Sequence, residues 1–173
     1  QRRGCQVAYP GLVEIGCGDG TVLAYCAERL PGISTAIGLD INAAVIARVS
    51  AEQPAGGPLE FAEAEARDWL IANPQAGTLV LSNGGVLEYF SQDNVDALLQ
   101  ALALAPPAAI VLIEPVAPSH DLQGQEDSFA FGKENSFSHN HRRRLNAAGF
   151  EVAFAEEKWI AGVRWMLMIG ILK

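Results

Sequence analysis

The chain has 173 residues, of which 50% are hydrophobic and 18% charged, a composition typical of a folded globular protein. Its formal net charge is −8 and its pI is about 4.8. An acidic surface repels phosphate backbones, so the charge argues against a nucleic-acid partner. The longest nearly apolar stretch, residues 101–113, contains two prolines and is shorter than the ~20 residues that a membrane span needs. A single domain without a nucleic-acid or membrane partner is therefore expected.

Cysteine usage and the N-terminus set further limits. Cys5, Cys17 and Cys26 are odd in number and show no C-x-x-C spacing, so we expect neither a disulfide framework nor a metal site. Sparse, unpaired cysteines make the reducing cytoplasm the expected location. The chain has no initiator Met, and no apolar signal segment follows Gln1, so the sequence is interpreted as a fragment or a processed form.

Short apolar runs alternate with helix-like segments along most of the chain. The runs expected to form strands cover residues 11–15, 34–39, 59–63, 78–82 and 109–113. The segments expected to form helices cover residues 21–30, 43–53, 67–72, 92–105 and 140–148. Asn42 and Ser91 are suitable N-caps for two of these helices. This alternation favours an α/β fold with a parallel sheet and crossover helices.

Two segments after residue 113 break the alternation. Residues 115–138 are polar and too long for an ordinary connection, which makes them a candidate functional loop. Residues 151–160 and 164–172 are strand-like, and only residues 161–163 separate them. A connection that short forces an antiparallel hairpin, because a parallel crossover needs a dozen or more residues.

Three glycines follow the first predicted strand at alternate positions. Glu14 lies near the end of that strand, and Gly16, Gly18 and Gly20 come after it. Glycine allows positive φ and close approach to the backbone, so a ligand is expected on this turn. The spacing resembles motif I of the class I S-adenosylmethionine (SAM) dependent methyltransferases, (Asp/Glu)-x-Gly-x-Gly-x-Gly. A dinucleotide-binding loop would need its third glycine where Thr21 stands, so a nicotinamide (NAD) dependent oxidoreductase is a less favoured alternative.

The resemblance implies a complete fold. It predicts a three-layer α/β sandwich around a mostly parallel seven-stranded sheet, in the order 3-2-1-4-5-7-6, with the hairpin supplying the last two strands. Residues 1–173 then form a single methyltransferase domain. Family members usually carry helices before the first strand, and only ten residues precede it here. We therefore expect the N-terminal cap to be absent or truncated, with a homodimer partner or an adjacent domain completing the site.

Four motifs carry the cofactor site that the resemblance implies. They are the glycine turn with Glu14, residues 40–41, residues 65–66 and residues 83–84. Asp40 ends the second predicted strand, where an acid can accept the hydroxyls of a ribose. In the family, the residue after this acid packs on the adenine of SAM. The implied cofactor-binding residues are Glu14, Gly16, Cys17, Gly18, Gly20, Asp40, Ile41, Glu65, Ala66, Asn83 and Gly84. The purely structural alternatives are a helix N-terminal acid at position 40, a solvated acid at position 65 and an ordinary turn after the fourth strand.

Methyl transfer needs a positioned acceptor and, for a hydroxyl or a protonated amine, a base. Histidine suits the role of base near neutral pH. The candidate catalytic residues are His120 in the long loop, His139 at the start of the last helix and Tyr89 after the fourth strand. A surface or capping role is the alternative for each histidine. His139 and His141 are two residues apart and share no helical face, so we expect no metal between them.

Other residues near the predicted site remain open between two interpretations. The phenylalanines of the long loop are Phe129, Phe131 and Phe137. They are expected either to close over the acceptor as a lid or to anchor the loop. Glu114, at the end of the fifth strand, is a further candidate for the cleft. Trp159 and Trp165 on the terminal hairpin are expected in the core.

Together these features predict transfer of a methyl group from SAM to a small or medium-sized metabolite, with S-adenosylhomocysteine (SAH) as product. The alternative is a non-catalytic, degenerate methyltransferase module that binds SAM without turnover. The sequence names neither the acceptor nor the methylated atom.

Overall fold

The computed structural model describes residues 9–53, 57–132 and 134–173. Cys5 and residues 54–56, which belong to a Pro- and Gly-rich segment predicted to form a turn, lie outside these ranges. Within them, no helix is both long and apolar enough to cross a membrane.

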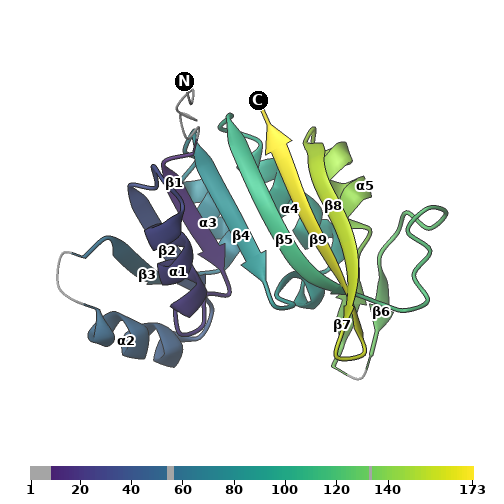
Figure 1. The fold of residues 1–173 in the computed structure, drawn as a ribbon, viewed down its shortest axis with the longest axis horizontal. Coiled ribbons are helices and arrows are strands. Elements are labelled where there is room, and N and C mark those ends of the chain that lie inside the picture. Colours follow the sequence, from purple (N-terminus) through teal and green to yellow (C-terminus); the bar gives the residue numbers. More distant parts are fainter. Residues whose placement is uncertain (1–8, 54–56, 133) are drawn as a thin grey trace.

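A seven-stranded sheet forms the centre of the fold (Figure 1). Its strands in chain order are β1 (Gly11–Ile15), β2 (Thr35–Asp40), β3 (Leu59–Glu63), β4 (Thr78–Asn83), β5 (Ala108–Val116), β8 (Glu151–Ile160) and β9 (Val163–Leu172). They are arranged in the order β3-β2-β1-β4-β5-β9-β8. The first five strands are parallel, and β9 is antiparallel to both β5 and β8. The predicted sheet order is therefore confirmed, with β8 and β9 as the sixth and seventh strands.

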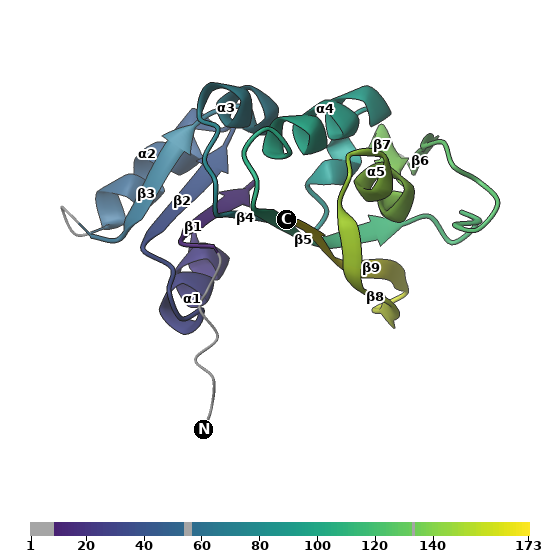
Figure 2. The same cartoon turned by 90° about the horizontal axis from the view of Figure 1, so that it is seen from above.

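Helices cover the sheet on two sides. They are α1 (Thr21–Arg29), α2 (Ala43–Glu52), α3 (Ala66–Ala72), α4 (Gln92–Leu102) and α5 (His141–Ala147). Figure 2 shows α1 on one side of the sheet and α3, α4 and α5 on the other. The two expected caps are present, because Asn42 accepts hydrogen bonds from the first turn of α2 and Ser91 accepts one at the start of α4. The three-layer α/β arrangement is thus confirmed.

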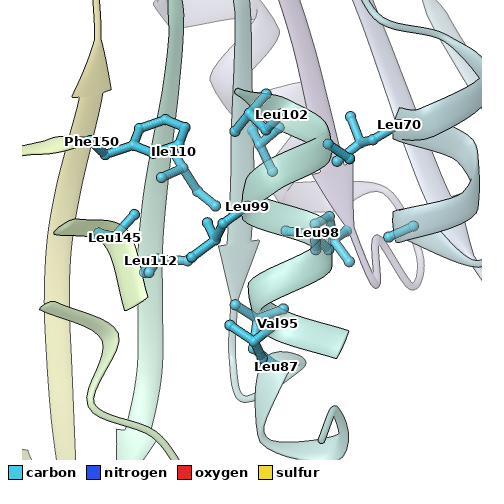
Figure 3. Packing of buried hydrophobic residues seen from close by; sticks show 14 of the residues in the cluster. Leu70, Leu87, Val95, Leu98, Leu99, Leu102, Ile110, Leu112, Leu145 and Phe150 are labelled. Carbon is cyan, nitrogen blue, oxygen red and sulfur yellow. The ribbon is translucent and has the colours of Figure 1, made fainter. Parts of the chain in front are cut away.

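The largest core cluster lies between the sheet and the helices α3, α4 and α5 (Figure 3). In α4, Val95, Leu98, Leu99 and Leu102 recur at the spacing of one helical face, and all four are buried. They meet side chains of β4 and β5 as well as Leu145 of α5. This packing fixes the carboxyl ends of the parallel strands relative to the segments that follow them.

The region after β5 differs most from expectation. Strand β5 continues to Val116 because β9 pairs with it over its whole length. The expected long loop contains a second, two-stranded sheet of β6 (Phe129–Phe131) and β7 (Ser136–Ser138). A short 3-10 helix, η1 (Leu87–Tyr89), follows β4 and was not predicted. Local sequence patterns are weak for elements as short as these.

The expectation that Trp159 belongs to the core is wrong, because its exposed fraction is 59%. Trp159 lies on β8, an edge strand with β9 as its one neighbour in the sheet, and most side chains of β8 are exposed. Trp165 on β9 is half-buried. In the long loop, Phe129 packs edge-on against His120 and Phe137 stacks on His139, whereas Phe131 is exposed. Two of the three phenylalanines therefore anchor the loop.

Candidate active site

The turns after β1, β2, β3 and β4 converge at the carboxyl edge of the sheet and enclose a cavity of about 300 Å³, which we call the strand-end cavity. The strand order changes direction at β1 and β4, and ligands of open α/β sheets bind at such a point. The cavity is lined by Ile15, Gly16, Leu39, Asp40, Ile41, Ala64, Ala66, Gly85, Val86, Tyr89 and Phe90. Its size falls at the lower end of the range of ~300–1,000 Å³ for small-molecule sites.

The three glycines of the first turn all have positive φ, but for different reasons. A Cβ atom at Gly16 would lie 2.6 Å from the Val86 side chain, and one at Gly20 would lie 2.7 Å from the ring of Phe61. At Gly18 a Cβ atom would meet nothing within 4 Å. Gly16 and Gly20 therefore permit close packing inside the protein. At Gly18 the space beside the Cα atom is open, and contact of this residue with a ligand stays a prediction.

Asp40 holds the glycine turn against the end of β2. Its Oδ2 atom accepts a hydrogen bond from the backbone N–H of Gly18 at 3.2 Å, and its Oδ1 atom accepts one from Asn42 at 2.9 Å. A carboxylate offers about four acceptor positions, so about two remain for the hydroxyls of a ligand. The cap of α2 is Asn42, which frees Asp40 from that role. Asp40 lines the cavity, so position and chemistry both suit a ribose.

Glu14 lies in β1 beneath the turn, with an exposed fraction of only 3%. Burial raises the pKa of its carboxyl to about 7, against the smaller opposing effect of the Leu23 backbone N–H. One oxygen, Oε2, has no hydrogen-bond partner among the described residues. Burial likewise raises the pKa of the neighbouring Cys17 thiol to about 12, which keeps it neutral. Glu14 precedes the turn and Cys17 lies within it, and contact of either with a cofactor stays a prediction.

The later cofactor motifs show a mixture of structural and cavity-lining residues. The Glu65 carboxylate caps α3 by accepting a hydrogen bond from the backbone N–H of Asp68 at 3.0 Å, while Ala66 lines the cavity. Asn83 ends β4, and Gly84 follows it with positive φ and open space beside its Cα atom. Of the predicted cofactor-binding residues, those that line the cavity are Gly16, Asp40, Ile41 and Ala66. The others belong to the strands and turns around it.

Sequence reasoning missed the apolar wall that the turn after β4 supplies. Val86 and Phe90 line the cavity beside Tyr89. Glu114 holds this turn in place, because its carboxylate accepts hydrogen bonds from Ser82 Oγ at 2.6 Å and from the backbone N–H of Leu87 at 3.1 Å. Its exposed fraction is 0%, and burial raises its pKa to about 7. Glu114 is thus a buried anchor of the turn and does not line the cleft for which it was a candidate.

Tyr89 lines the strand-end cavity and is 57% exposed. Its hydroxyl donates a hydrogen bond to the Glu134 carboxylate at 3.2 Å. This hydrogen bond raises the pKa of Tyr89. The side chain is therefore a neutral hydroxyl at the rim of the cavity, able to contact a ligand but unsuited to accept its proton.

The three histidines lie together, and none of them lines the strand-end cavity. His120 Nδ1 is 2.8 Å from Ser138 Oγ. His139 donates from Nε2 to the Leu87 carbonyl at 3.0 Å, because a carbonyl can only accept. Its Nδ1 then accepts from the Ser128 hydroxyl at 2.7 Å, so both nitrogens of His139 are occupied.

Burial lowers the pKa of all three histidines, that of His141 to about 3. They are neutral near pH 7, and their hydrogen bonds tie the long loop to η1 and β7. In the described ranges of the chain, no group of His, Cys, Asp and Glu side chains is arranged to hold a metal ion.

A sequence model of the methyltransferase domain family matches residues 12–105, which is more than half of the chain. The match runs from β1 to the end of α4 and includes the glycine turn. The chain belongs to this family. The resemblance found in the motifs is thereby confirmed, and the nicotinamide-dependent oxidoreductase loses its support.

Individual proteins agree with this assignment. A trans-aconitate 2-methyltransferase from Streptomyces avermitilis is 37% identical over 75 residues, which make up 42% of this chain and 27% of that protein. The matched part thus spans about a quarter of the length of this relative.

Solved structures share the fold at low sequence identity. A proposed SAM-dependent methyltransferase from Listeria monocytogenes has a TM-score of 0.70 at 14% identity, over 96% of this chain and 93% of that chain. A magnesium protoporphyrin IX methyltransferase from Synechocystis PCC 6803, crystallised with SAM, has a TM-score of 0.64 at 16% identity, over 97% of this chain and 72% of that chain. At such identities the likeness establishes the fold alone.

Proposed function

We propose that the chain transfers the methyl group of SAM to a small or medium-sized metabolite and releases SAH. The observation that carries this proposal is the pairing of Asp40 with Gly18 at the strand-end cavity. The carboxylate keeps acceptor positions for a ribose, and the adjacent turn leaves open space beside the Cα atom of Gly18. Membership in the methyltransferase domain family supports the same conclusion.

The residues around the strand-end cavity fit SAM. Asp40 would hold the ribose hydroxyls, and Ile41, 77% exposed at the cavity, would cover the adenine together with Val86 and Phe90. The open backbone at Gly18 would lie along the rest of the cofactor. When bound, SAM supplies an electrophilic methyl group, and its loss converts a cationic sulfonium into a neutral thioether. The task of the protein is then to position the acceptor and exclude water.

A small-molecule acceptor fits the chain better than a macromolecule. The net charge of −8 disfavours nucleic acid. The relative from Streptomyces avermitilis is named for a small molecule, trans-aconitate. The fold also holds further cavities of about 290 and 370 Å³ beyond the strand-end cavity, large enough for a metabolite. A cytoplasmic location, the single-domain organisation and completion of the site by a second copy or another domain are part of this proposal.

The candidate catalytic residues take different roles in the proposal. Tyr89 lies at the cavity and is proposed to contact the bound reactants. His139 has no ring nitrogen left for an acceptor, so we assign it to holding η1 in place. His120 keeps Nε2 without a partner among the described residues, but that atom is buried, and we assign it to the position of the loop.

Isothermal titration with SAH tests the cofactor site. Asp40→Asn keeps the shape of the side chain but removes its charge and one acceptor oxygen. We expect SAH affinity to fall about tenfold or more, which is the usual effect of losing hydrogen bonds to a charged group. Asp93→Asn, the same change at an exposed position of α4, is the control and should leave the affinity unchanged. Equal affinity in both variants, or no binding by the unaltered chain, would refute the proposed site.

A module that binds SAM without turnover is the second candidate function. It is favoured by one observation, namely that the three histidines are buried and neutral instead of facing the strand-end cavity. A turnover assay that measures SAH formation against a broad panel of metabolites separates the two functions. Methylation of any acceptor above the background of Asp40→Asn rejects the non-catalytic module.

A further inference from the structure

A second cavity, of about 370 Å³, lies beside the turn that follows β4, and we call it the hairpin cavity. Its walls come from η1, the end of β5, the β6–β7 hairpin and the tip of the β8–β9 hairpin. Most of its lining is apolar and includes Pro115, Phe131, Phe137, Val163 and Trp165. Rings and flat prolines of this kind favour a flat apolar ligand.

Glu88 lies at the boundary of the two cavities. Gly85 lines the strand-end cavity, and a Cβ atom built on it would be 2.5 Å from Glu88 Oε1 and 3.4 Å from Pro115 Cδ. The carboxylate of Glu88 therefore folds back over the Cα atom of Gly85. Glu88 and Pro115 themselves line the hairpin cavity. A ligand in the hairpin cavity that reached the carboxylate would thus be directed towards the strand-end cavity.

Glu88 and Arg164 are the charged residues among those that line the hairpin cavity in the described chain. The guanidinium of Arg164 is engaged, because it donates to the carbonyls of Ala117 and His120 at 3.1 and 2.8 Å and to the Glu157 carboxylate at 2.7 Å. Glu88 is half-buried. Its carboxylate is consequently the group that sets the polarity of the cavity.

Other titratable groups surround Glu88. Glu134 lies between β6 and β7, Tyr89 is the next residue, Glu114 lies beneath the turn, and Arg164 faces the same cavity. Burial raises the pKa of Glu88; the Ser136 hydroxyl opposes this with a smaller effect, and the Glu134 carboxylate adds the smallest effect, in the same direction as burial. A raised pKa makes the carboxylate a stronger base than one in free solution.

We propose that the hairpin cavity is the acceptor site and that Glu88 binds and deprotonates an acceptor that carries a hydroxyl or amino group on a flat apolar ring or on a carbon attached to one. The inference rests on the proposed function. The acceptor oxygen or nitrogen forms a bond to the methyl carbon, whose bond to sulfur breaks with the electron pair remaining on sulfur. The proton of the acceptor passes to the Glu88 carboxylate and from there to water. A carboxylate acceptor is disfavoured, because its charge would meet that of Glu88.

Three probes with the same aromatic ring test whether the hairpin cavity prefers an amine or a hydroxyl to a carboxylate. Benzylamine, benzyl alcohol and benzoate are titrated into the chain in the presence of saturating SAH, and binding is followed by the NMR signal of the Trp165 indole N–H. We expect benzylamine to bind most tightly, benzyl alcohol less tightly and benzoate most weakly. As the pH falls and Glu88 becomes protonated, benzylamine affinity should fall and benzoate affinity should rise. Tighter binding of benzoate than of benzylamine near pH 8 would overturn the proposal.

The variant Glu88→Gln tests whether Glu88 is the residue that causes the preference for benzylamine over benzoate. We expect benzylamine affinity to fall about tenfold, in line with loss of a charge-assisted hydrogen bond, and benzoate affinity to rise. SAH affinity should change less than about twofold in the same variant, since the cofactor contacts assigned above do not include Glu88. Glu60→Gln removes the same charge from the exposed edge strand β3 and is the control.

The two levels of the proposal fail separately. If SAH does not bind, the proposed function is wrong. If SAH binds and Glu88→Gln leaves the affinities of the three probes unchanged, the function stands and the acceptor site is wrong. A difference between Glu88→Gln and Glu60→Gln in probe binding, with equal SAH affinity, supports the acceptor site alone.

Discussion

The two halves of the sheet place their polar residues in different ways. Around β1 and β2, short turns present Gly18 and Asp40 directly after the strands that carry them. Around β5 and β9, the polar residues come from a long segment whose histidines and serines bond mainly to one another and to backbone carbonyls. The first half is a proposed binding edge, and its form is set by local sequence. The second is a wall whose form depends on contacts between distant segments.

The largest effect is expected in the core of the second half. Phe150 precedes β8 and has an exposed fraction of 2%, whereas Trp159 on the same hairpin is 59% exposed. Phe150→Ala should lower the free energy of unfolding by about 4 kcal/mol through the cavity it creates. Trp159→Ala should change it by less than about 0.5 kcal/mol. Urea denaturation measures both, and similar losses would show that the hairpin packs differently from the structure.

A pH effect of intermediate size on the free energy of unfolding is expected from Glu114, which lies on β5 and holds the turn after β4. Burial raises its pKa in the folded chain to about 7, above the ordinary value of 4.5. The folded state therefore binds this proton more tightly, so the contribution of Glu114 to stability is greatest below pH 4.5 and falls as the pH rises towards 7. A shift of this size corresponds to about 3 kcal/mol.

Glu114→Gln stays neutral at every pH and serves as the reference for this effect. When the pH is raised from 4.5 to 7.5, the free energy of unfolding should fall more for the unaltered chain than for Glu114→Gln. Glu14 has a similarly raised pKa and is present in both proteins, so its effect on stability cancels when the two proteins are compared. Equal pH dependence in the two would show that the Glu114 carboxyl is ionised without penalty.

The smallest difference concerns two glycines of the binding edge. Both Gly16 and Gly84 have positive φ, but a Cβ atom at Gly16 would lie 2.6 Å from Val86, whereas at Gly84 it would meet nothing within 4 Å. Gly84→Ala should cost about 1 kcal/mol, from backbone strain alone. Gly16→Ala should cost about 2 kcal/mol more, because overpacking adds to the strain. Adding Val86→Ala should recover part of the loss only in the Gly16 variant, as a thermal or urea melt would reveal.

The sequence predicted the first half well because its signals are local. Alternating apolar runs and helix caps located the parallel strands, and glycine spacing with Asp40 located the turn that borders the strand-end cavity. The wall of the second half was not predicted, because it depends on contacts between segments that are distant in the sequence. Val86 and Phe90 reach the strand-end cavity through η1, which Glu114 fixes from a different strand. Glu88 lies in the segment after the fourth strand, but the pattern there assigns it no role. The sequence also does not reveal the distant partners of the histidines, which are Ser128, Ser138 and the Leu87 carbonyl.

The most direct test of the central claim is a crystal structure of the chain with SAH. The account predicts SAH in the strand-end cavity, with its ribose hydroxyls donating hydrogen bonds to the Asp40 carboxylate and its chain lying along the backbone at Gly18. The sulfur should face the turn that carries Gly85 and Glu88. Electron density for SAH elsewhere on the chain, or a bound SAH whose ribose makes no contact with Asp40, would contradict the account.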